Sequence, residues 1–223
     1  MPFHFFYFAF QKLFQKLNAS DLASLKSTGA AARRLIMAGR MPDDLANEII
    51  LNYRELSKKY EMKNADVAVR SSATAEDLPS ASFAGQHETY LNVVGDKALI
   101  NAVKECMASL FTDRAIAYRE EKNFEHLKIA LSVGIQKMVH SDLASAGVIF
   151  TLDTETGFDK VVLVNSIWGV GEMIVKGKIT PDEFFVFKPT LKKGFRSIIE
   201  KNLGRKTKKY IYGNGGLKEV EVS

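Results

Sequence analysis

The stretch from residue 67 to residue 93 constrains the fold more than any other part of the chain. Residues 67–69 read Val-Ala-Val, a short β-branched run that predicts a strand. Arg70 and several hydroxyl residues follow at once, and the small-residue segment 80–85 separates them from a second predicted strand at residues 89–91. Two strands joined by a polar loop require a sheet in this part of the chain.

The polar residues at the end of the first predicted strand suit a phosphate group. The guanidinium of Arg70 can hold two phosphate oxygens, and the hydroxyls of Ser71 and Ser72 add donors. Small side chains around Gly85 let a backbone approach a ligand closely. A strand end followed by a polar hairpin loop has the same pattern, and the residues alone leave both interpretations open.

Residues 1–62 are expected to form a helical segment without evident chemistry. Apolar residues from Phe3 to Leu17 fall on one helical face, and helices are also predicted over 21–39 and from residue 41 onward. Ser20 and Gly39 are the expected caps of the second helix. The apolar run at the start is too short to span a bilayer.

Residues 63–223 are expected to form the main part of an α+β fold with mixed or antiparallel strands. A single long helix is predicted from Lys97 to Glu121, and the apolar run Ile129–Val139 is predicted as a central strand. A polar hairpin is expected at 153–159. Further strands are predicted at 145–151, 161–165, 184–187, 198–199 and 210–212.

Composition excludes some classes of protein. The only cysteine, Cys106, allows no internal disulfide and lies in a helical pattern, so we expect a packed thiol and a cytoplasmic protein. The segment 192–209 holds eight basic residues and one acid, Glu200. Such a segment can bind nucleic acid, but no nucleic-acid module accompanies it, so a solvated face or the rim of an anion site is the preferred interpretation.

Six blocks of the sequence resemble the nucleotide-binding domain of the pyruvate phosphate dikinase family. They lie in the family's order from about Asp66 to the end, which is far more specific than one glycine-rich motif. The blocks are AVRSSATAEDLPSASFAGQHETY, SLFTDRAIAYR, LSVGIQKMV, SDLASAGVIF, WGVGEMIVKG and PDEFFVFKPTL.

The resemblance implies an ATP-grasp fold, in which two α+β lobes hold ATP between them. Family members transfer the β-phosphoryl group of ATP to a histidine on a mobile domain. In the branch that this sequence resembles most, a barrel domain passes the group to pyruvate, and the products are AMP, phosphoenolpyruvate and phosphate. ATP and Mg²⁺ are therefore the implied cofactors. His87 lies in no phosphohistidine motif of the family and is given no carrier role.

The resemblance also implies site residues. Arg70 matches the family's phosphate-binding arginine and is the implied catalytic residue. Gly85 and Thr89 match loop and strand contacts to the nucleotide, and Gln136 matches a contact on the strand that links the lobes. Backbone groups of that strand can read the adenine edge, and Met138 can pack on the ring.

Two further residues are weaker candidates. Arg114 falls near the triphosphate in the family, although a solvated ion pair explains it equally well. Glu172 follows the glycines of residues 168–171, a loop that the resemblance places at the active-site cleft and that a plain turn would also explain.

Parts of the family pattern are not found. No G-G-K-x-A-x-L-G segment precedes residue 20, and no D-I-E-W or V-Q-A-R-P-E segment follows, so no metal ligand is assigned. We expect pyruvate to bind domains outside this chain. The chain is expected to be an incomplete domain, unable to complete the reaction alone, with uncovered sheet edges that favour self-association.

Three other functions remain open from the residues. The chain could be an ATP-binding module without catalysis, or part of a rifampicin-type phosphotransferase, which shares the signature. It could also bind nucleic acid through residues 192–209.

Overall fold

The computed structural model describes residues 3–18, 20–73, 77–78, 81–82, 88–213 and 216–222. Contacts divide the chain into two units, Met1–Met138 and Val139–Ser223. Within the described ranges, no helix combines the length and hydrophobicity that a membrane crossing requires.

The first unit holds the long helices of the chain. They are α1 (Phe3–Phe14), α2 (Leu22–Ala38), α3 (Asp43–Lys59), α4 (Asp96–Ala108) and α5 (Asp113–Glu121). The prediction of helices before residue 62 is confirmed. The cap of α2 is Asp21 rather than Ser20, because the Asp21 carboxylate accepts hydrogen bonds from Ala23 N (3.0 Å) and Ser24 N (3.3 Å).

The prediction of one continuous helix over residues 97–121 is wrong. After α4 the chain tightens into the 3₁₀ turn η1 (Ser109–Phe111), and Thr112 is extended, with φ −67° and ψ 153°. The Thr112 hydroxyl accepts a hydrogen bond from Ala115 N (3.3 Å) and begins α5 as a new helix. The helical spacing of apolar residues continues across this break, so periodicity alone does not reveal it.

The sheet of the first unit has three antiparallel strands in the order β4-β1-β5. They are β1 (Val67–Ala73), β4 (Thr89–Val93) and β5 (Leu131–Lys137); β2 (Asp77–Leu78) and β3 (Ala81–Ser82) form a separate pair. The expectation that β5 is central is wrong, because β1 holds that position. Every second residue of β5 is exposed, so its apolar run covers only one face.

A bulge interrupts the pairing of β1 with β4. Val67 pairs with Val93, but Val69 pairs with Tyr90, so β4 contains one more residue than β1 over this interval. Asn92 lies inside the interval with φ +56°, a left-handed conformation that asparagine tolerates better than most residues.

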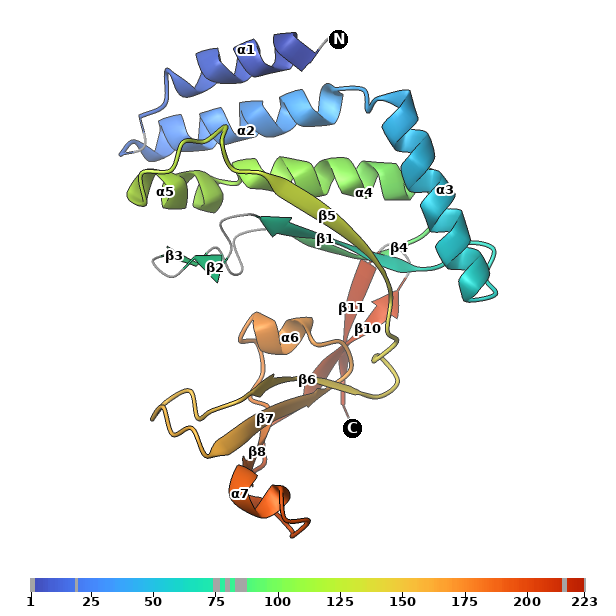
Figure 1. Ribbon diagram of the computed structural model, residues 1–223, viewed down its shortest axis with the longest axis vertical. Coiled ribbons are helices and arrows are strands. Elements are labelled where there is room, and N and C mark those ends of the chain that lie inside the picture. The colour runs from blue at the N-terminus through green and yellow to red at the C-terminus, as the bar shows by residue number, and fades with distance from the viewer. Residues whose placement is uncertain are drawn as a thin grey trace. The chain divides into compact units, whose positions relative to one another are not determined.

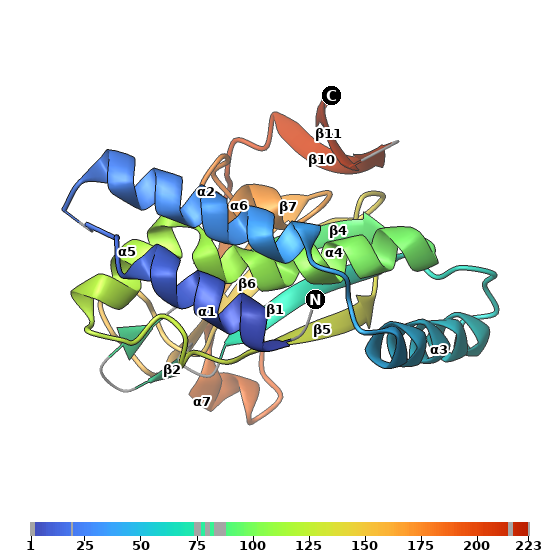
Figure 2. The ribbon, with the colours of Figure 1, turned by 90° about the horizontal axis from the view of Figure 1, so that it is seen from above.

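Helices cover one face of this sheet. In Figures 1 and 2, α4 lies on the strands, and α2 and α1 are stacked beyond it. The core between α4, α3 and the sheet consists of Tyr53, Ala65, Val67, Val69, Leu99, Ala102, Val103 and Cys106. A second cluster joins α1 and α2 to α5, and its buried members are Phe10, Leu25, Ala32, Phe111 and Ile116. The packed position expected for Cys106 is confirmed.

The second unit contains a four-stranded antiparallel sheet in the order β6-β7-β8-β9. Its strands are β6 (Ser145–Phe150), β7 (Val161–Trp168), β8 (Asp182–Phe187) and β9 (Ile198–Asn202). The short helices α6 (Glu172–Val175) and α7 (Lys188–Leu191) follow β7 and β8, and β10 (Lys208–Gly213) pairs with β11 (Gly216–Glu221). The predicted strands and the polar connection at 153–159 are confirmed.

Gly169 joins the end of β7 to β10. Its φ is +76°, and a Cβ atom there would lie 2.4 Å from the carbonyl oxygen of Tyr210. The next residue, Val170, donates its N–H to that same oxygen at 3.0 Å. This close backbone approach leaves room only for glycine.

We predict that Gly169→Ala destabilises the second unit more than Gly157→Ala does. Both glycines have a positive φ, +76° and +74°, so either alanine incurs about 1–2 kcal/mol of backbone strain. Only Gly169 has backbone within 4 Å of the added Cβ. Thermal unfolding followed by the fluorescence of Trp168, the one tryptophan, measures the difference. Equal losses in the two variants would contradict the steric argument.

Candidate functional site

The three-stranded sheet presents a polar face on the side away from its helices. Along β1, Val67 and Val69 are buried while Arg70 and Ser72 are exposed, as the alternation of a pleated strand requires. Arg70 pairs with Thr89 on β4 and with Gly134 on β5. One row across the sheet therefore consists of Thr89, Arg70 and Gly134, all exposed.

Neighbouring rows extend this polar face. Gln136 pairs with Ala68, so it lies diagonally from Arg70 on the same face, at about 7–8 Å between Cα atoms. Ser72 pairs with Ser132, whose hydroxyl donates to the Ser72 carbonyl at 3.3 Å. The sheet thus brings together four residues that were singled out in the sequence: Arg70, Ser72, Thr89 and Gln136.

Gly134 leaves space for the side chain of Arg70. A Cβ atom at Gly134 would lie 3.6 Å from Cγ of Arg70, so any branch beyond Cβ would meet the arginine stem. Sequence reasoning missed this residue and also Ser132. A glycine inside an otherwise apolar strand is the signal that could have drawn attention to it.

The guanidinium of Arg70 is available to a ligand. It is exposed, and among the described residues none forms a hydrogen bond or ion pair with it. A guanidinium on an open sheet face, with a hydroxyl and an amide beside it, can bind an oxyanion through several donors.

Ser71 points to the other face of the sheet. It lies on the side of α4 and Cys106, whose thiol donates to the Glu88 carbonyl at 4.0 Å. Burial raises the pKa of Cys106 to about 11, and the side chain of Ser71 opposes that rise. The structure therefore separates Ser71 from Arg70, although the two are adjacent in the sequence.

The end of β5 is fixed by a buried ion pair. Nζ of Lys137 lies 2.6 Å from Oδ1 of Asp66, and it also donates to the Met138 carbonyl at 3.1 Å. The Met138 N–H donates to the Asp66 carbonyl at 3.0 Å, and the Met138 residue is 8% exposed. Both backbone groups of Met138 are thus engaged within the protein.

The remaining predicted residues lie elsewhere. Arg114, in the first turn of α5, is exposed and lies 3.9 Å from the Glu88 carboxylate, next to Thr89. Glu172 belongs to the second unit, where it begins α6 and pairs with Lys176. Gly85 and His87 lie outside the described residues. In the described ranges, no three His, Cys, Asp or Glu side chains are grouped to hold a metal.

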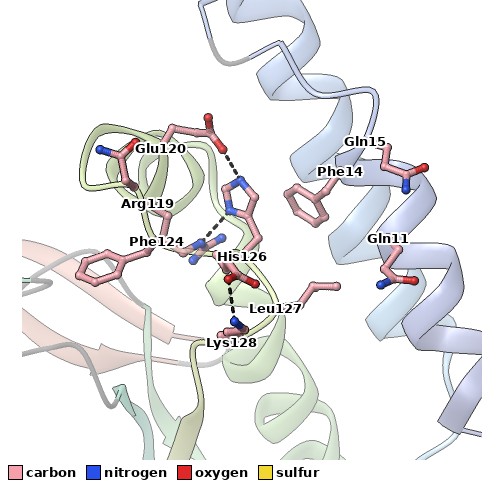
Figure 3. A pocket seen from close by; sticks show the side chains of 11 residues that line it. Gln11, Phe14, Gln15, Arg119, Glu120, Phe124, His126, Leu127 and Lys128 are labelled. Carbon is pink, nitrogen blue, oxygen red and sulfur yellow. Dashed lines mark hydrogen bonds and ion pairs between the residues drawn. The ribbon is translucent and has the colours of Figure 1, made fainter.

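A pocket of about 540 Å³ lies between α1, α5 and the segment 123–128. Figure 3 shows the His126 ring between the side chains of Glu120 and Arg119. Nε of Arg119 donates to Nδ1 of His126 (3.0 Å), and Nε2 of His126 lies 2.6 Å from the Glu120 carboxylate. Because arginine cannot accept a hydrogen bond, Nδ1 is the unprotonated nitrogen and the imidazole is neutral.

Burial shifts the titration of this pocket. It lowers the pKa of Arg119 to about 10, against the opposing charge of Glu120, so the guanidinium stays charged at neutral pH. Burial also lowers the pKa of His126, the charge of Arg119 adds to the effect, and Glu120 opposes it. The chain Arg119–His126–Glu120 is therefore a cation, a neutral ring and a carboxylate.

Comparison with known proteins identifies the family. Residues 9–223 match the model described as pyruvate phosphate dikinase, AMP/ATP-binding domain. The chain belongs to this family, and the resemblance noted in the sequence is confirmed.

Three similar relatives from different bacteria share one name. The chain is 58% identical over 205 residues to phosphoenolpyruvate synthase of Aquifex aeolicus, covering 92% of the chain and 24% of the relative. It is 55% identical over 205 residues to the Helicobacter pylori synthase (92% and 25%) and 49% identical over 201 residues to that of Escherichia coli (90% and 25%). The chain thus spans about a quarter of the length of these curated relatives.

We predict that protonation of His126 destabilises the first unit. Because the pKa of His126 is lowered in the folded state, the unfolded chain binds the proton more readily. The free energy of unfolding should therefore fall as the pH drops below about 6.5. His126→Gln should flatten this dependence, because an amide can accept from Arg119 and donate to Glu120 without titrating.

Urea unfolding at a series of pH values measures this effect. The control is His140→Gln in the second unit, which removes an imidazole outside this pocket, and the reference is the pH dependence of the wild type. If His126→Gln keeps that dependence, the assignment to His126 is wrong.

Proposed function

We propose that the polar face of the β4-β1-β5 sheet binds the phosphates of ATP, within a nucleotide-binding domain of the ATP-grasp type. The observation that carries the proposal is the register of β1, which sets Arg70 between Thr89 and Gly134 with Gln136 on the same face. Membership of a family described as AMP/ATP-binding supports ATP as the ligand.

Several exposed hydrogen-bond donors on this face would bind the polyphosphate together. Arg70 would bind phosphate oxygens bidentately and stabilise charge on the transferring group, the main electrostatic demand of phosphoryl transfer. The hydroxyls of Thr89 and Ser72 and the amide of Gln136 would add neutral donors beside it.

The other predicted residues have subordinate roles in this proposal. Gly85 and Arg114 would contact the nucleotide phosphates, and Glu172 would have the nucleotide-site role that the family resemblance implies. The Met138 side chain would pack on the adenine ring. Since both backbone groups of Met138 are engaged, the adenine edge would be read by other groups. Magnesium would accompany the triphosphate, without an assigned ligand among the described residues.

We further propose that the chain is the ATP-binding portion of a phosphotransferase with the activity of its relatives. They are named phosphoenolpyruvate synthase. The reaction that the resemblance implies is the conversion of ATP, pyruvate and water into AMP, phosphoenolpyruvate and phosphate. The donors around Arg70 would act on the first half-reaction, in which the β-phosphoryl group leaves AMP.

The first test is calorimetric titration of the chain with ATP and Mg²⁺. We predict saturable binding that Arg70→Ala weakens by about tenfold or more, because a charged multidentate contact is worth about 1.5–3 kcal/mol. The matched control is Arg34→Ala, an exposed arginine on α2 away from the sheet. Binding that is unchanged in folded Arg70→Ala would refute the site.

A second prediction concerns the space beside Arg70. Gly134→Val should weaken ATP binding several-fold, because its methyl groups would displace the arginine stem that lies 3.6 Å from the added Cβ. Ser132→Val is the control, since it adds valine on the same face of β5, opposite Ser72. Circular dichroism establishes that both variants are folded, and equal affinities in the two would show that Gly134 has no positioning role.

A further inference from the structure

Arg119 is a buried charge whose hydrogen bonds are incompletely met. The residue is 0% exposed, and Nη1 and Nη2 have no hydrogen-bond partner in the described part of the chain. Nε binds His126, and the ring of Phe111 lies 5.5 Å from Cζ, which compensates only part of the lost hydration. A buried cation left in this condition destabilises the folded chain until a partner meets its donors.

The pocket beside Arg119 has the volume of a small-molecule site. Its volume of about 540 Å³ falls within the range of ligand pockets. Phe14, Phe124 and Leu127 are its apolar lining, and Gln11 on α1 and Gln15 just after α1 contribute amides (Figure 3). The three apolar side chains can pack against the carbon skeleton of an organic molecule, which an inorganic ion lacks.

The charges around the pocket favour a ligand with one negative charge. Glu120 is engaged with His126, and Glu125 lies 2.6 Å from Lys128 at the exposed rim. Arg119 is thus the cation with unmet donors, while two carboxylates lie close enough to repel a multiply charged phosphate. The geometry of a guanidinium fork fits the two oxygens of a carboxylate.

We propose that this pocket is a binding site for a small organic carboxylate, held by the terminal amino groups of Arg119. Both amino groups are buried in this structure, so binding requires a lining side chain to move. The site lies among α1, α5 and the segment 123–128, whereas Arg70 lies on the uncovered face of the sheet. It is independent of the nucleotide site proposed above.

The test is an NMR titration of the full chain with benzoate, acetate and inorganic phosphate as probes. The signals followed are the Arg119 side-chain Nε–H and the His126 ring. We expect saturable shifts with both carboxylates, tighter for benzoate, and binding of phosphate weaker by about tenfold. Phosphate binding as tight as benzoate, or no saturable shift with either carboxylate, would overturn the assignment.

Two variants locate the binding. Arg119→Gln should abolish the His126 shift, whereas Arg34→Gln, on the exposed surface of α2, should leave it unchanged. Gln11→Trp keeps Arg119 and changes an exposed residue of α1, so it tests the pocket even if Arg119→Gln does not fold. The larger ring should fill the pocket and weaken the binding of benzoate by about tenfold. Wild-type affinity in folded Gln11→Trp would exclude the pocket as the site.

Discussion

The alternation of side chains along β1 is the constraint on which both the core and the proposed site of the first unit depend. Val67 and Val69 face α4 and are fully buried, while Arg70 and Ser72 face away and are exposed. Because the pleat has a period of two residues, a slip of one residue would bury the guanidinium and expose the valines. The apolar core therefore holds Arg70 on the outer face as firmly as any direct contact would.

Local sequence patterns predicted the helices and strands, but they did not predict which strands are neighbours in the sheet. The strands around residues 67 and 161 and the helices before residue 62 follow from periodicity alone. The position of β5 at the sheet edge does not, since an apolar-rich segment such as Ile129–Val139 fits a central strand equally well. The break at Thr112 was missed because the helical spacing of apolar residues continues across it, although threonine is a preferred N-cap residue.

The proposed site was only partly accessible from the sequence. Arg70, Thr89 and Gln136 were singled out by resemblance, and the sheet brings them onto one face. Gly134 and the pairing of Asp66 with Lys137 were not foreseen, because each depends on which residues of distant segments become neighbours. Strand register is a property of the folded sheet, so a glycine that accommodates an arginine from another strand is identified only once the strands are paired.

The bulge in β4 decides which side chain stands beside Arg70. If the present sequence continued the pairing of Val67 with Val93 regularly, with no bulge, Tyr90 would lie opposite Arg70 and Thr89 would face the helices. With the bulge, Tyr90 pairs with Val69 and packs against the core, and Thr89 pairs with Arg70. The bulge thus keeps a hydroxyl, and not an aromatic ring, beside the guanidinium. Deletion of Asn92 would make the two strands equal in length over this interval, so it would remove the bulge and still leave Thr89 opposite Arg70.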